Sequence, residues 1–132
     1  MPIRRVVTGH DAQGRSCFVM DGPAPHTSQR VPGGTHVTEL WRTLTTPAEN
    51  ADATDPTAPP YRLLPPENGS VLRIISYPPD SIRLGAIAAE RANAAHDTSG
   101  RSAATDHNNP RHPGFHKTNS TDYAIVLSGE IY

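Results

Sequence analysis

Short runs of apolar and β-branched residues, separated by turn residues, are the main pattern in the first part of this chain. Residues 3–7 (IRRVV) and 15–20 (RSCFVM) are two such runs, and Gly9, Asp11 and Gly14 lie between them. Glycine and aspartate readily adopt the backbone conformations that tight turns need. The two runs therefore predict a β-hairpin.

Two more strands are predicted further along the chain. Residues 35–43 (THVTELWRT) alternate loosely between polar and apolar positions, which favours a strand with one buried face. Trp41, the only tryptophan, is interpreted as a packing residue of that face. Residues 70–77 (SVLRIISY) are the strongest strand pattern, and Pro78 and Pro79 end it because proline disfavours continuation of a strand ladder.

Proline and glycine mark the segments that separate these strands. Residues 21–34 are too rich in both to predict a strand ladder, since proline has no amide hydrogen to donate. Residues 44–67 hold six prolines and predict a long loop, and the polar residues 97–114 predict another. Between the last strand and the second loop, the alanine-rich residues 81–96 predict a helix or partial helix.

The closing segment returns to β character. Residues 115–118 (FHKT) and 123–127 (YAIVL) are β-prone runs with a short polar turn between them. A further turn is expected at 128–130, and residues 131–132 open one more strand. In total, the chain predicts about six or seven strands and one short helix, so the fold class is mainly β.

Composition narrows the class of protein. A length of 132 residues suits one domain. The 12 basic and 13 acidic residues are spread along the chain and give a formal charge of −1, so neither nucleic acid nor a membrane surface is expected as a partner. No apolar run has the length of a signal peptide or membrane span, which predicts a soluble, cytoplasmic protein. The single cysteine, Cys17, is expected to be a buried, inert thiol.

The clearest candidate for chemistry lies in the closing segment. His116 is separated by one residue from Thr118, Asp122 follows after three more residues, and Gly129 follows after another six. In this register the string HKTNSTDYAIVLSGE resembles the first motif of small single-domain cupins, in which two histidines, an acidic residue and a glycine have this spacing. Three upstream strings also resemble the N-terminal part of those proteins: RRVVTGHDAQGRS, TELWRT and GSVLRIISYPPD.

This resemblance implies a cupin-like, RmlC-like antiparallel β-sandwich or jelly roll, incomplete because the chain stops after the first motif. In the family, the motif's histidines and acidic residue bind a divalent metal, since residues two apart on a strand point to one face. Here Thr118 replaces the second histidine, so the metal site is degenerate and only His116 and Asp122 are left as ligands. The cofactor is therefore left unidentified, and a divalent transition metal is not expected in this chain.

The resemblance further implies a small-molecule protein, with decarboxylase, isomerase or cyclase chemistry of metabolite biosynthesis. His116 would be the general acid or base and Asp122 its polar partner, with alternate side chains, including Ala124 and Val126, facing inward with His116. The alternative is a non-catalytic module that binds a ligand or forms a homodimer through an exposed strand edge, or an inactive cupin fragment. Independently of this resemblance, Asp122 is expected to accept local hydrogen bonds at the turn.

Other candidate groups are weaker. His107, His112 and His116 are spaced by five and four residues, but they lie in a loop-like segment without cysteine, so solvent-exposed histidines are the preferred interpretation. Glu39 has no paired partner that is detectable in the sequence.

Overall fold

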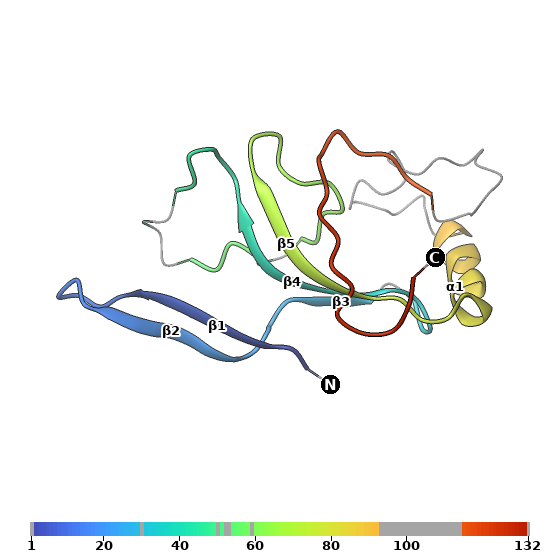
Figure 1. Ribbon diagram of the computed structural model, residues 1–132, viewed down its shortest axis with the longest axis horizontal. Coiled ribbons are helices and arrows are strands. Elements are labelled where there is room, and N and C mark those ends of the chain that lie inside the picture. Colours follow the sequence, from blue (N-terminus) through green and yellow to red (C-terminus); the bar gives the residue numbers. More distant parts are fainter. Residues whose placement is uncertain are drawn as a thin grey trace.

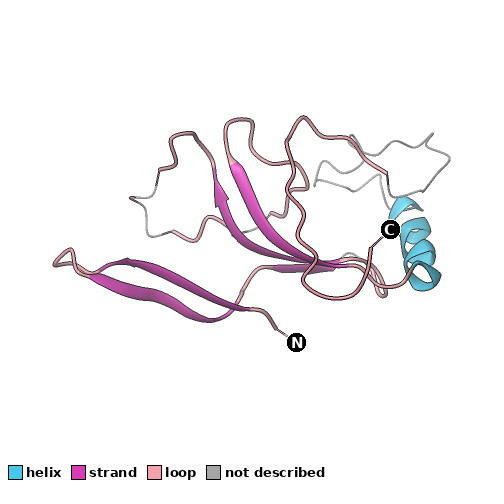
Figure 2. Cartoon of the chain, in the orientation of Figure 1, coloured by secondary structure: helices cyan, strands magenta, loops and turns pink. Residues whose placement is uncertain are grey.

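The fold is mainly β, as predicted, with two antiparallel sheets and one short helix, an arrangement consistent with a β-sandwich (Figure 1). The computed structural model describes residues 2–29, 31–49, 51, 54–58, 60–92 and 115–131. Its elements are β1 (Arg4–His10), β2 (Ser16–Pro23), β3 (Thr27–Gln29), β4 (His36–Thr43), β5 (Ser70–Ser76) and α1 (Asp80–Ala92). Strands β1 and β2 form one sheet, and the other has the order β3-β4-β5 (Figure 2).

The first sheet is the predicted hairpin. Its register pairs Arg4 with Pro23 and His10 with Ser16. Asp11 organises the turn, because its Oδ1 accepts hydrogen bonds from the amide nitrogens of Gln13 and Arg15, each at 2.9 Å. These contacts explain why a short polar stretch reverses the chain here.

The hairpin buries few of its own side chains. Phe18 is largely exposed, and Cys17, which was predicted to be buried, is a free thiol that is partly exposed. A two-stranded sheet has no neighbouring strands to cover it, so its side chains are buried only where another element lies against them. The other element is the second sheet, which the hairpin meets through Arg5.

The prediction that residues 21–34 form no ladder is wrong in part. Strand β2 continues through Pro23, and Thr27–Gln29 pair with β4 as β3. Pro23 stands at the end of a two-stranded ladder, where a missing amide donor costs little. The three residues of β3 contain no proline, so their amides are free to pair.

The second sheet is centred on β4, whose pairing with β5 contains an irregularity that matters for the site. Glu39 pairs with Arg73 and Trp41 pairs with Leu72, so Leu40 is the extra residue of a β-bulge. An extra residue shifts the alternation of side chains by one. Arg42 therefore lies on the same face as Glu39, although the two residues are three apart.

The loop and the helix agree with the sequence as far as they are described. The described residues of 44–67 contain no strand or helix. The helix was predicted over 81–96 and α1 spans Asp80–Ala92, beginning directly after two prolines; residues 93–96 and the predicted loop at 97–114 lie outside the described residues. Within the described ranges, no helix is long and apolar enough to cross a membrane.

The strand predicted at 123–127 is wrong for this structure. These residues join no ladder, and Tyr123, Ile125 and Leu127 are 93%, 83% and 73% exposed. Strand propensity reflects packing against neighbouring strands, and this segment has no paired strand beside it. The described residues accordingly hold five strands rather than six or seven.

Candidate functional site

The predicted site residues lie on the surface, in a segment held by local hydrogen bonds. His116 is exposed, and its backbone makes a single β-bridge. Asp122 is also exposed, and the Ser120 hydroxyl donates to its Oδ1 at 2.7 Å. Because the Ser120 proton is used there, the 2.7 Å contact between the Thr118 and Ser120 hydroxyls has Thr118 as donor. The side chains form a chain in which Thr118 donates to Ser120 and Ser120 donates to Asp122.

The prediction that alternate side chains face inward with His116 is wrong. Ala124 and Val126 are exposed to solvent instead. Among the residues that the structure describes, no group of three or more His, Cys, Asp or Glu side chains is placed to hold a metal ion. His107 and His112 lie outside the described residues.

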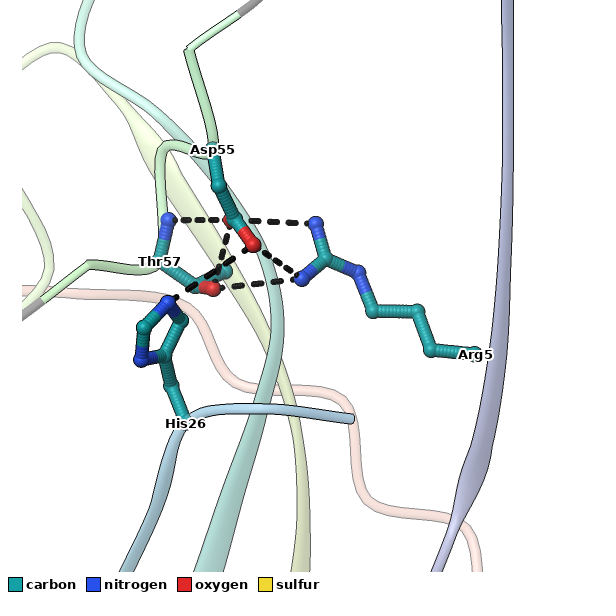
Figure 3. Close-up of polar contacts among 4 residues, drawn as sticks. All are labelled: Arg5, His26, Asp55 and Thr57. Atoms are coloured by element: carbon teal, nitrogen blue, oxygen red, sulfur yellow. Dashed lines mark hydrogen bonds and ion pairs between the residues drawn. The ribbon is translucent and has the colours of Figure 1, made fainter. Parts of the chain in front are cut away.

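A polar cluster that the sequence did not indicate joins the hairpin to the proline-rich loop (Figure 3). Arg5 of β1, which is only 5% exposed, binds the Asp55 carboxylate through two nitrogens, with Nη1 2.6 Å from Oδ2 and Nη2 3.0 Å from Oδ1. Thr57 donates to Oδ1 of Asp55 from its amide at 2.9 Å and from its hydroxyl at 2.7 Å. His26 Nε2 lies 3.7 Å from Oδ2, beyond hydrogen-bonding distance.

The chemistry of this cluster is that of a structural tie. Burial alone would raise the pKa of Asp55, but the hydrogen bonds from Arg5 and Thr57 and the Arg5 charge outweigh it and hold the pKa well below its ordinary value. The Arg5 guanidinium also lies over the Trp41 ring, 5.5 Å from its centre, so Trp41 packs as predicted. With its oxygens already bound, Asp55 is poorly suited to proton transfer.

A second charged cluster lies on one face of the β4–β5 sheet, the face on which the bulge places Arg42 together with Glu39. The Glu39 side chain is 4% exposed, and its Oε1 lies 3.2 Å from Arg73 Nε while its Oε2 lies 4.0 Å from Arg42 Nη2. Neither carboxylate oxygen makes a hydrogen bond within the described part of the chain. Burial raises the pKa of Glu39, and the charges of Arg73 and Arg42 offset this only in part.

The two arginines of this cluster differ in their other contacts. Arg73 donates to the backbone carbonyls of Leu63 and Arg62, each at 3.1 Å, and lies over the Tyr61 ring. Among the described residues, Arg42 has only the long contact with Glu39, and its Nε and Nη2 are buried without a hydrogen bond. No partner of Glu39 is detectable in the sequence, for two reasons. Simple alternation puts Arg42 on the opposite face of the strand from Glu39. Arg73 comes close to Glu39 only through the pairing of β4 with β5.

Comparison with known proteins adds no family. No family model matches the chain, and no curated protein matches it in sequence. What the protein does is therefore argued from its own residues and their geometry.

Proposed function

We propose that this chain is a cupin-like protein that binds a small molecule, with His116 and Asp122 as polar contacts to the ligand. The spacing of His116, Thr118, Asp122 and Gly129 supports the family. The observation that carries the binding role is the local order of this surface segment, in which a β-bridge holds His116 and the Ser120 hydroxyl orients Asp122. An imidazole and a carboxylate that are both exposed on the surface can be reached by a ligand from solvent.

A binding role that needs no metal is favoured over metal-dependent catalysis. Transition metals prefer imidazole, thiolate and carboxylate ligands, and the Thr118 hydroxyl at the second histidine position is a poor substitute. That hydroxyl also donates to Ser120. If the protein catalyses a decarboxylation, isomerisation or cyclisation, His116 would move the proton, since an imidazole both takes up and releases protons near neutral pH.

Ligand binding and metal content test this proposal together. The purified chain is analysed for Fe, Mn, Ni and Zn, and its melting temperature is then measured with a panel of neutral and anionic metabolites. We expect less than stoichiometric metal, and stabilisation by at least one compound that is lost in His116→Ala and kept in His10→Ala, a variant of another exposed histidine. Stoichiometric metal, or equal stabilisation of both variants, would contradict the proposal.

A second candidate function, homodimer formation through strand edges, is favoured by the exposure of residues 123–127. This β-prone segment is unpaired, and β5 has a neighbour on only one side in the order β3-β4-β5. An unpaired strand and an open edge are the usual ingredients of strand addition between chains. Sedimentation should show a dimer that Ile125→Lys disrupts and that Thr121→Lys, a charge added nearby, preserves; a monomer at high concentration excludes this candidate.

A further inference from the structure

The β4–β5 face carries more positive than negative charge in a buried setting. Two guanidinium groups, Arg42 and Arg73, surround the single carboxylate of Glu39, and the exposed fractions of the two arginine side chains are 11% and 12%. Buried charges cost free energy unless they are paired and hydrogen-bonded. This face therefore carries one positive charge more than it carries negative charges.

The imbalance belongs to Arg42. Arg73 has two carbonyl acceptors, an aromatic ring and the closer carboxylate oxygen. Arg42 has no acceptor within hydrogen-bonding distance in the described part of the chain, and Glu39 is the only acid there within ion-pair distance of it. The described residues thus provide no hydrogen-bond acceptor for the Arg42 guanidinium group.

We propose that Arg42 is the anchor of a binding site for a small carboxylate ligand on this face, with Glu39 and Arg73 as its neighbours. The proposal goes beyond the proposed function, because it rests on residues other than His116 and Asp122. The guanidinium nitrogens form a planar fork, and a carboxylate offers two oxygens with matching spacing. Nε and Nη2 are buried, so Nη1 is the nitrogen at which a ligand from solvent meets the group.

Glu39 fits beside a bound carboxylate only in one form. Ionised, it would repel the ligand; protonated, it donates a hydrogen bond to the ligand's oxygen. Burial raises the pKa of Glu39, so protonation of this carboxyl is easier than at an exposed glutamate. Substitution by glutamine reproduces the neutral, hydrogen-donating state and should preserve or strengthen binding.

The test follows the Arg42 Nε–H resonance in nitrogen–proton NMR spectra of the full chain. Acetate, malonate and inorganic phosphate are titrated against chloride at equal ionic strength, and the resonance is assigned from its absence in Arg42→Lys. We expect a saturable shift with the carboxylates in the parent. In Arg42→Met, where this resonance is lost, the backbone amide shifts of Glu39 and Arg73 should show binding weakened about tenfold, as the loss of one charge-assisted pair predicts. Arg15→Met, which removes an exposed arginine of the hairpin turn, should bind as the parent does.

Each outcome decides the proposal. No saturable shift in a folded protein, equal binding by Arg42→Met and Arg15→Met, or a response to phosphate alone would overturn it. If Arg42→Met does not fold, Arg42→Lys keeps the charge but loses the fork, and it must bind at least about fivefold more weakly than Arg15→Lys. A ligand that depends on His116 but not on Arg42 would leave the proposed function standing without this site, whereas the reverse result would leave only this site.

Discussion

The Asp55 and Glu39 regions combine the same chemical groups and reach opposite results. Asp55 meets Arg5 with two short hydrogen bonds and receives two more from Thr57. Glu39 lies between two arginines but makes no hydrogen bond in the described part of the chain. The pKa of Asp55 is held below its ordinary value, while that of Glu39 is raised. Hydrogen-bond geometry, rather than the number of nearby opposite charges, decides whether a partly or fully buried carboxylate stabilises the fold.

This difference also separates structure from function. A carboxylate whose acceptors are filled holds two parts of the chain together, and nothing remains for a ligand to bind. A buried group with unfilled hydrogen-bonding capacity costs stability, and proteins retain such groups most often at functional sites. The Asp55 cluster is thus a structural tie, and the Glu39 cluster is the better place to look for a ligand.

Removing the Asp55 carboxylate should give the largest effect. Asp55→Ala leaves the buried Arg5 guanidinium without its partner, and we expect the free energy of unfolding to fall by about 3 kcal/mol in urea denaturation. Asp21→Ala is the matched control, because Asp21 also binds an arginine, Arg4, through two nitrogens, both at 2.7 Å, but in an exposed pair. That variant should lose clearly less stability than Asp55→Ala, because solvent screens an exposed pair. Equal losses would show that burial of Arg5 contributes nothing.

Acid should remove the same stabilisation more gradually. The pKa of Asp55 is lower in the folded state than its ordinary value of 3.8, so its contribution is present above that pH and is lost as pH falls through the folded-state pKa. We expect the stability difference between the parent and Asp55→Asn to be on the order of 2 kcal/mol at pH 7 and to shrink steadily below about pH 4. Urea titrations at several pH values measure it, and a difference independent of pH would contradict the assignment.

The Glu39 carboxylate should behave in the opposite sense. Its raised pKa means that the folded state favours the protonated acid, so this contribution is present below the ordinary pKa and is lost as pH rises through the raised one. At pH 7 Glu39→Gln should therefore be more stable than the parent, by about 0.5–1 kcal/mol. Glu67→Gln, at an exposed position, should change stability by less than about 0.5 kcal/mol. A clear loss in Glu39→Gln would mean that the two arginines satisfy the carboxylate.

How far the sequence predicts these regions depends on where each signal lies. The hairpin, β4, β5 and most of α1 follow from local patterns, because each element carries its own apolar run and turn residues. The pairing of Arg5 with Asp55 joins residues fifty positions apart, and no local pattern records it. The approach of Arg42 to Glu39 depends on the extra residue at Leu40, which simple alternation does not reveal. Residues 123–127 show the converse, since strong β propensity produces no strand where no partner strand lies alongside.

The aromatic rings beside the two regions offer the finest comparison. The Arg5 guanidinium lies over Trp41 and the Arg73 guanidinium over Tyr61, both 5.5 Å from the ring centre. A cation–π contact strengthens as the cation loses water, and tryptophan is a better partner than tyrosine. Double-mutant cycles with leucine at the ring and methionine at the arginine should give coupling energies of about 1 kcal/mol for Trp41–Arg5 and about 0.5 kcal/mol for Tyr61–Arg73. Arg73 keeps its two carbonyl acceptors when the Tyr61 ring is removed, so the loss of Tyr61 should change the position of Arg73 little. A coupling energy at Tyr61 as large as that at Trp41 would mean that the ring, and not the backbone carbonyls, holds Arg73 beside Glu39.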